Sequence, residues 1–177
     1  MLLEEDFEGA FPGATWDLFD WSSGSDWDWG VTDADAHGGI QSVWPAAGGD
    51  DAVDPDTDDY PTNLDTAMRC GPFDLSDAQE AELVFYYWLR AHKGLAGSGD
   101  EDVFRYGASS DGEWYDGYEY TGSSEGWQRE SLDLAAWVGE PQVWIVFSFH
   151  SGEAFTERGV FVDDVLLQKY VSAASPG

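Results

Sequence analysis

A strand is predicted at Leu83-Val84-Phe85-Tyr86-Tyr87-Trp88-Leu89, where β-branched and aromatic residues follow one another without a charged side chain. A second run, Val143-Trp144-Ile145-Val146-Phe147-Ser148-Phe149, has the same character. Runs that are apolar at both odd and even positions are typical of central strands covered on both faces. The two runs therefore predict the central strands of a β-sheet protein.

Shorter β-prone runs, separated by Gly, Asp, Ser and Pro, surround these two. The turn Ser109-Ser110-Asp111-Gly112 carries the Asp-Gly pair that favours a tight hairpin. Helix is predicted only as single turns, at 74–80 and 134–138. The pattern predicts an all-β sandwich. Its clearest strands are expected at 82–91, 102–108, 114–120, 127–134, 142–150 and 159–170, and further strands at 16–21, 27–31 and 40–44 have a weaker sequence signal.

The size and composition of the chain predict one domain with a substantial core. It has 177 residues, of which 42% are hydrophobic and 16% aromatic. We predict a single domain over 1–170 and a linker-like tail over 171–177, where small residues precede Pro176 and Gly177. The predicted core comprises Phe7, Leu83, Phe85, Tyr87, Leu89, Val103, Leu132, Leu134, Val143, Ile145, Phe147, Val160, Val162 and Val165.

The charge of the chain limits its partners. Asp and Glu total 36 against 7 Lys and Arg, which gives a formal net charge of -29. Nucleic acids and anionic membranes attract basic surfaces, so neither is an expected partner. The excess of acid favours calcium, cationic partners or neutral ligands such as sugars. Adaptation to a saline habitat is the alternative explanation, which the many large aromatics favour less, and a comparison of calcium with matched sodium separates the two.

Three further features bear on where the protein works. No run approaches the roughly 18 to 20 apolar residues of a membrane span, so no membrane insertion is expected. The single cysteine, Cys70, excludes an internal disulfide and is expected to be a buried small hydrophobe. No signal peptide is visible. We expect a piece of a longer secreted protein, located outside the cell or on its surface, although a complete cytosolic protein is also compatible.

Acidic residues bracket the chain within β-prone stretches. One stretch is Asp6-Phe7-Glu8-Gly9 and the other is Phe161-Val162-Asp163-Asp164-Val165. An unpaired charge buried there would cost roughly several kcal/mol. The first and last strands of a sandwich are commonly neighbours, and calcium prefers oxygen ligands. We therefore predict a structural calcium ion held by Asp6, Glu8, Asp163 and Asp164; the alternative is exposed acids on edge strands.

A second acidic stretch, Asp54-Pro55-Asp56-Thr57-Asp58, alternates acids as the start of an EF-hand loop does. This alternation makes Asp54, Asp56 and Asp58 candidate calcium ligands. The pattern then departs from an EF-hand, because Asp59 replaces the turning Gly and no helices flank it. A solvated acidic loop is the alternative. Asp33, Asp35 and His37 form a third acidic turn, which is weak evidence for zinc.

Aromatic residues supply the candidate ligand-binding surface. Trp114, Tyr118 and Tyr120 share parity on one predicted strand and would form a flat platform for sugar rings. The alternative is that they belong to the core. The same two interpretations apply to Trp16, Trp21, Trp27 and Trp29.

No catalytic motif accompanies these residues. The sequence has no Gly-x-Ser-x-Gly elbow and no His-Glu-x-x-His zinc-peptidase motif. Carboxylate pairs for glycoside cleavage are uninformative in so acidic a chain.

An ordered set of short motifs resembles a known family. It runs from Glu5-Asp6-Phe7-Glu8-Gly9 through Asp28-Trp29-Gly30, Tyr60-Pro61-Thr62-Asn63 and Gly71-Pro72-Phe73-Asp74-Leu75 to Gly159-Val160-Phe161-Val162-Asp163-Asp164-Val165. The set resembles the MAM-like jelly-roll domains appended to secreted bacterial peptidases, including those of the immune-inhibitor-A type. It is similar, more distantly, to jelly-roll carbohydrate-binding modules. The resemblance covers roughly residues 4–169.

This resemblance implies a two-sheet antiparallel jelly-roll β-sandwich without a catalytic site. It also implies a structural calcium between the first and last strands, at Glu8, Asp163 and Asp164. The acidic insert at 50–59 is longer than the family leads us to expect, and Cys70 lacks the partner found in animal relatives.

The predicted function is that of a non-catalytic, calcium-stabilised extracellular accessory or adhesion module within a larger secreted bacterial protein. Its partner would be a glycan or an extracellular protein, together with the neighbouring domains of the longer chain. The first alternative is a carbohydrate-binding module that uses Trp114, Tyr118 and Tyr120. A hydrolase is a third possibility, which turnover of generic esters, glycans or casein would reveal.

Overall fold

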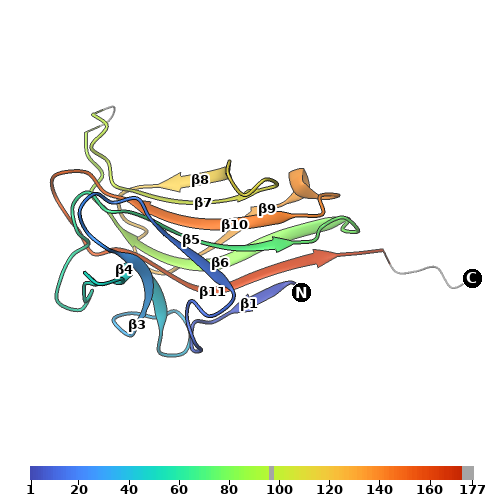
Figure 1. Cartoon of the computed structure of the whole chain (residues 1–177), viewed down its shortest axis with the longest axis horizontal. Coiled ribbons are helices and arrows are strands. Elements are labelled where there is room, and N and C mark those ends of the chain that lie inside the picture. Colours follow the sequence, from blue (N-terminus) through green and yellow to red (C-terminus); the bar gives the residue numbers. More distant parts are fainter. Residues whose placement is uncertain (96–97, 173–177) are drawn as a thin grey trace, which may run out of the picture.

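Two antiparallel sheets pack face to face in the computed structural model, which describes residues 1–95 and 98–172 (Figure 1). Sheet A has the strand order β3-β4-β11-β6-β9, with β1 also paired to β11, and sheet B has the order β2-β5-β10-β7-β8. The elements are β1 (Leu3–Glu5), β2 (Trp16–Asp20), β3 (Asp28–Thr32), β4 (Ser42–Gly48), β5 (Asp65–Phe73), β6 (Glu80–Arg90), β7 (Val103–Ser109), β8 (Asp116–Tyr120), β9 (Gln128–Asp133), the 3-10 turn η1 (Ala135–Trp137), β10 (Val143–His150) and β11 (Gly159–Tyr170). The predicted jelly-roll β-sandwich is confirmed.

The two apolar runs form interior strands, as predicted. β6 lies between β11 and β9, and β10 lies between β5 and β7. In β10 the residues at odd positions from Val143 to Phe149 are buried, whereas Trp144, Val146 and Ser148 are half-buried. The prediction that this strand is covered on both faces is therefore wrong for its outward face, which remains accessible.

Two strands were absent from the sequence prediction or misplaced by it. β5 was missed because Arg69, Gly71 and Pro72 interrupt its apolar pattern, yet it pairs with both β2 and β10. β1 ends at Glu5, so the stretch 6–9 forms bends after the strand. The chain turns there because Phe7 has a positive φ of 56° and Asp6 accepts the Glu8 N–H at 3.1 Å.

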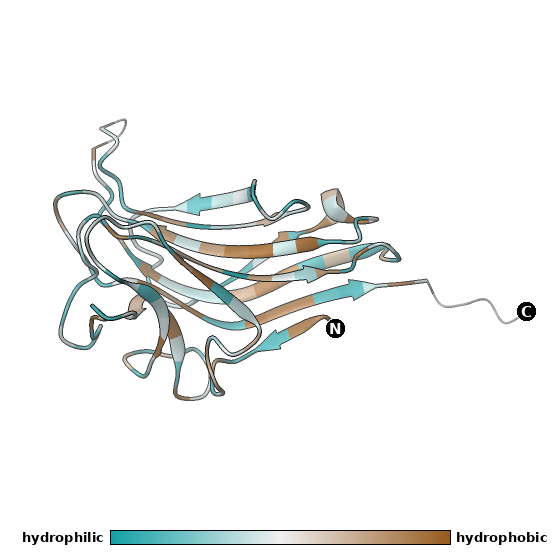
Figure 2. Ribbon diagram, in the orientation of Figure 1, coloured by the Kyte–Doolittle hydropathy of each residue, from teal (hydrophilic) through white to brown (hydrophobic). Residues whose placement is uncertain are grey.

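The core lies between the sheets, and every predicted core residue except Val103 is buried. Val103 is half-buried because β7 points Phe104 and Tyr106 inward and its odd positions outward. Figure 2 shows hydrophobic residues along β10 and along parts of β6 and β11, whereas the connecting loops are mixed in hydropathy. Cys70 is buried as predicted, and burial raises the pKa of its thiol.

The first and last strands are neighbours, as predicted. Leu3 of β1 is the partner of Leu167 in β11, whereas earlier in β11 Val162 pairs with Val43 of β4. Along the side of β11 that does not pair with β6, the neighbouring strand is therefore first β4 and then β1. The pairing of β11 with β6 is irregular between Asp163 and Leu166, and Asp164 has a φ of 48°. This bulge places both aspartates at the gap between β4 and β1.

Helix is limited to η1 in the part of the chain that the structure describes, where no helix is long and apolar enough to cross a membrane. Residues 173–177 of the predicted tail lie outside the described residues.

Candidate functional site

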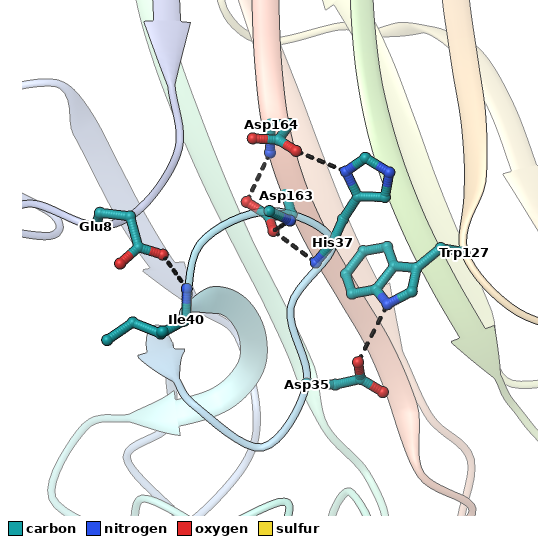
Figure 3. Close-up of polar contacts among 8 residues, drawn as sticks. Glu8, Asp35, His37, Ile40, Trp127, Asp163 and Asp164 are labelled. Atoms are coloured by element: carbon teal, nitrogen blue, oxygen red, sulfur yellow. Dashed lines mark hydrogen bonds and ion pairs between the residues drawn. The ribbon is translucent and has the colours of Figure 1, made fainter.

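The acids that bracket the chain meet one loop, residues 33–41, between β3 and β4 (Figure 3). Glu8 approaches this loop from one side, where its Oε1 accepts the N–H groups of Ile40 at 2.7 Å and Gln41 at 2.8 Å. Asp163 and Asp164 approach from the other side, from the bulge in β11. The structure therefore brings Glu8, Asp163 and Asp164 to the same loop.

Asp163 is fully buried and receives three backbone N–H groups. Its Oδ2 accepts from His37 at 2.8 Å and Gly38 at 3.0 Å, and its Oδ1 accepts from Asp164 at 2.7 Å. Burial raises the pKa of the Asp163 carboxyl, while these N–H donors act in the opposite direction. Backbone donors therefore supply part of the compensation that the sequence analysis assigned to a cation.

His37 completes this cluster. Its Nδ1 lies 2.6 Å from Asp164 Oδ2, and its ring stacks on Tyr86 with the centroids 3.6 Å apart. Trp127 lies edge-on to the same ring and donates its Nε1–H to Asp35 at 3.1 Å. The acidic turn at residues 33–38 thus packs over Asp163 and Asp164 of β11.

Whether this cluster can bind calcium depends on the oxygen atoms that it offers as ligands. A Cβ at Gly39 would clash with Glu8 Oε1, and one at Gly38 would fall 2.8 Å from Asp164 Oδ2, so two adjacent glycines make room for the carboxylates. Hard carboxylate oxygens suit calcium. No three His, Cys, Asp or Glu side chains are arranged to hold a metal within residues 1–95 and 98–172. Main-chain carbonyls would therefore have to supply the remaining ligands, and the calcium assignment stays a prediction.

The other predicted metal ligands lie elsewhere. Asp6 turns its carboxylate onto the Glu8 N–H in an Asx turn. Asp54, Asp56 and Asp58 are exposed; Asp54 accepts the Asp56 N–H at 2.9 Å, and Asp58 accepts the Thr57 hydroxyl at 2.7 Å. The carboxylates of Asp54 and Asp58 bind groups within the turn itself, which agrees with the solvated loop that the sequence left open.

The predicted aromatic platform is not one surface. Trp114 precedes β8 and is 81% exposed, whereas Tyr118 and Tyr120 lie in the strand opposite the buried Tyr106 and Phe104. Residues directly opposite in an antiparallel pair point to the same face, so both tyrosines belong to the inward face.

The two tyrosines nevertheless differ in exposure. Tyr120 stacks on Tyr87 and donates its hydroxyl to Glu130 at 2.8 Å, so it faces the interior. Tyr118 remains 58% exposed at the edge.

A groove lies instead on the outward face of sheet B. It has a volume of about 710 Å³, within the range of about 300–1,000 Å³ typical of ligand pockets. Its floor consists of small residues from neighbouring strands, namely Ala67, Gly117, Val146 and Ser148. Strand register accounts for the alignment, because Ala67 pairs with Ser148 in the β5–β10 ladder. Arg69 and Arg105 share this face, opposite Val146 and Ser148 in the ladders, so the small residues lie between two arginine side chains.

Aromatic residues form the sides of the groove: Phe19, Trp21 and Tyr115, while Tyr118, on the inward face of the edge strand β8, borders the groove at its rim. Phe19 and Trp21 stack nearly parallel, with ring centroids 5.6 Å apart and an interplanar angle of 9°. Trp21 is 61% exposed, so its free face is available to a ligand. Of the four N-terminal tryptophans, Trp16 and Trp29 are buried and Trp27 is half-buried, which leaves Trp21 as the exposed one.

Two arginines in the groove are each paired with an acid. Arg69 Nη2 donates to Asp17 at 2.8 Å, and the guanidinium lies 4.9 Å from the centre of the Phe19 ring. The hydrogen bond to Asp17 raises the pKa of Arg69. Arg105 Nε donates to Glu119 at 3.0 Å.

In the hairpin 109–116, Gly112, Glu113 and Tyr115 form one wall of the groove. The carbonyl of Gly112 accepts from Arg69 Nη1 at 3.2 Å and from the Tyr115 hydroxyl at 3.1 Å. Asp111 Oδ1 accepts the N–H groups of Glu113 and Trp114 and the Ser109 hydroxyl. A hairpin is present at the predicted Asp-Gly, but its loop is longer than a tight turn, because the last ladder pair is Ala108 with Asp116. The loop is tied both to itself and to β5.

Comparisons with known proteins identify the fold. No protein-family model and no curated protein matches the chain. The chain is similar to the K1 cleaved adhesin domain of Lys-gingipain from Porphyromonas gingivalis W83, with 17% identity, a TM-score of 0.64, and coverage of 96% of this chain and 99% of that one.

Two carbohydrate-binding modules are also similar. TmCBM61, solved in complex with β-1,4-galactotriose, has 14% identity, a TM-score of 0.56, and coverage of 89% of this chain and 90% of that one. The CBM22-2 xylan-binding domain of Xyn10C from Paenibacillus barcinonensis has 15% identity, a TM-score of 0.52, and coverage of 96% and 100%. At these identities the likeness shows the jelly-roll fold shared by adhesin and carbohydrate-binding modules, and the resemblance to MAM-like domains stays a prediction.

Proposed function

We propose that the protein is a non-catalytic binding module that takes a sugar chain into the groove on the outward face of sheet B. The groove itself carries this proposal, because it combines a floor of small residues, the exposed face of Trp21 and polar groups along its length. Aromatic side chains present an apolar face on which sugar rings pack. The likeness to a galactotriose-bound module and to a xylan-binding domain supports this choice over the accessory role placed first in the sequence analysis.

The groove also supports binding over hydrolysis. Its acids Glu113 and Glu119 belong to one short segment, and Glu119 is held by Arg105. Asp17 beside the groove is held by Arg69. Release of reducing ends from the bound polymer would contradict the non-catalytic assignment.

The decisive test is a comparison of two tryptophans. Soluble β-1,4-galactan, xylan and glucan are titrated by calorimetry and by affinity electrophoresis. We expect Trp21→Ala to weaken binding at least about tenfold, or about 1.4 kcal/mol, because it removes the stacking face. Trp114→Ala is the matched control, since Trp114 is exposed but does not line the groove. Equal losses in both variants, or none in Trp21→Ala, would contradict the assignment of the groove.

Structural calcium at the loop 33–41 is the second part of the proposal. Glu8, Asp164 and loop carbonyls would hold the ion and fix the start of the chain to β11. At 100-fold excess over its dissociation constant, a ligand specific for the native state adds about 2.7 kcal/mol to the free energy of unfolding.

We expect calcium to raise the melting temperature above that in chelator at equal ionic strength. Glu8→Gln and Asp164→Asn should each reduce the rise, whereas Asp56→Asn should not, because Asp56 lies in the exposed turn. A rise no larger than that given by sodium chloride would reject the calcium site.

We further assign the module to the cell exterior, within a longer secreted protein. The two gingipain domains that are similar in fold are named as cleaved adhesin domains, and the galactotriose-bound and xylan-binding neighbours are named for their ligands. Adhesion to a glycan-bearing surface would unite these roles. Retention of the protein on polysaccharide-coated beads, lost in Trp21→Ala, would support it.

A further inference from the structure

The charges of the groove are balanced within the protein itself. Its two arginines, Arg69 and Arg105, each contact a carboxylate, so neither offers an isolated positive charge to a ligand. Glu113 adds a further acid at the wall. A carboxylate or sulfate entering the groove would therefore have to displace an existing acid from its arginine.

The paired arginines still offer hydrogen bonds. Arg105 binds Glu119 through Nε. The Arg105 side chain is 48% exposed and the Glu119 side chain is 65% exposed. A guanidinium carries five N–H donors, and a carboxylate accepts through two oxygens. Such a pair presents donors and acceptors side by side, which suits hydroxyl groups, because each hydroxyl both donates and accepts.

The net charge of the whole molecule also opposes the binding of an anionic ligand. A formal net charge of -29 surrounds the groove with a negative potential. At about 0.01 M salt the Debye length is about 30 Å, so acids well beyond the groove repel an anionic polymer. At about 1 M salt the length falls to about 3 Å and only local contacts remain.

We propose that the groove accepts uncharged glycans and rejects those that carry carboxylate or sulfate groups, through its paired arginines and the surrounding negative potential. This inference rests on the proposed glycan-binding function and adds its selectivity. It predicts that binding of a neutral glycan depends little on salt, whereas rejection of an anionic glycan weakens as salt rises.

The test compares three forms of one polymer. A neutral β-1,4-glucan, galactan or xylan that binds is compared with its carboxymethylated form and with a hydroxyethylated form of equal substitution, which controls for the size of the substituent. At about 0.01 M NaCl we expect the carboxymethylated polymer to bind at least about tenfold more weakly than the hydroxyethylated one. At about 1 M NaCl the difference should fall to about twofold or less.

Charge variants separate local from distant repulsion. Glu113→Lys reverses the charge of an acid at the wall that forms no ion pair within residues 1–95 and 98–172, whereas Glu4→Lys makes the same change of net charge on an exposed residue of β1 in sheet A. We expect Glu113→Lys to improve binding of the carboxymethylated polymer several times more than Glu4→Lys does. Circular dichroism confirms that both variants fold.

Three outcomes decide the matter. Binding of the carboxymethylated polymer at low salt as tightly as the hydroxyethylated one would overturn the selectivity and leave the glycan-binding function intact. An equal improvement in binding of the carboxymethylated polymer by Glu113→Lys and Glu4→Lys would overturn the role of the groove's own charges. Failure of every neutral polymer to bind would overturn the function and the selectivity together.

Discussion

At the scale of single residues, one fully buried carboxylate joins three loops at one end of the sandwich. Asp102 accepts the Tyr60 hydroxyl at 2.5 Å through one oxygen and the Gly152 N–H at 2.7 Å through the other. The Tyr60 hydroxyl in turn accepts the His92 N–H at 3.0 Å. Burial and the bond to Asp102 raise the pKa of Tyr60, so the phenol remains a donor across the physiological range.

Removal of that hydroxyl should be costly. Tyr60→Phe leaves a buried carboxylate oxygen and a backbone N–H without their partner, and we expect the free energy of unfolding to fall by about 1–3 kcal/mol. Urea denaturation measures the change. Tyr170→Phe, at a residue 49% exposed, is the control and should change stability by less than about 0.5 kcal/mol. Equal effects of the two changes would mean that this hydrogen bond contributes nothing.

At the scale of elements, the hairpin between β7 and β8 depends on Asp111. The N–H groups of Trp114 and Glu113 and the Ser109 hydroxyl lower the pKa of its carboxyl. A group whose pKa is lower in the folded than in the unfolded state stabilises the fold above its unfolded pKa, which is about 3.9 for Asp. That contribution is lost as the pH falls through the folded value.

We therefore expect the hairpin to loosen in acid before the sheets unfold. Amide exchange of Glu113 and Trp114 should accelerate as the pH falls below about 4, relative to amides of β10. Asp111→Ala should show fast exchange at every pH and weaker glycan binding, because one groove wall is loosened. Exchange that is as slow in Asp111→Ala as in the natural chain would contradict this role of Asp111.

The strands also show what the sequence could and could not predict. Strands such as β6, β10 and β11 were predicted within about two residues, because their apolar alternation is a local signal. β5 was missed because its position depends on pairing with β2 and β10, which overrides the Gly and Pro within it.

The candidate site was predicted only in part. Glu8, Asp163 and Asp164 were linked correctly to the meeting of the chain's two ends, since first and last strands often pair. The backbone N–H groups of the loop 33–41, which donate to these carboxylates, were not predicted. Every residue except proline has such an N–H group, so the residue types in the sequence do not show which ones will bind a carboxylate. The groove escaped prediction for a related reason: Ala67, Val146 and Ser148 are unremarkable singly, and only strand register puts them on one face.

At the scale of the whole molecule, the net charge of -29 sets the response to salt. Like charges repel more strongly in the folded chain than in the expanded one, so the excess of acid destabilises the native state. Salt screens that repulsion.

We expect the melting temperature to rise steadily between about 0.01 M and about 1 M NaCl. Scanning calorimetry measures the rise, and KCl should reproduce it, because screening depends on ionic strength rather than on the identity of the cation. A variant with Asp56 and Asp58 both changed to Asn should have a higher melting temperature than the natural chain at low salt, and its melting temperature should rise less as salt is added. A melting temperature that is flat or falling over this range would contradict the importance of self-repulsion.

The pairing of β1 with β11 has a practical consequence. Leu3 and Leu167 are partners on sheet A, whereas the groove opens on the outward face of sheet B, so both ends of the described chain continue from the sheet that does not carry the groove. Figure 1 shows both ends at the same end of the sandwich. A solid support, reporter enzyme or fluorophore attached through either terminus would leave the outward face of sheet B clear. The molecule is thus suited to oriented immobilisation as a probe for polysaccharides.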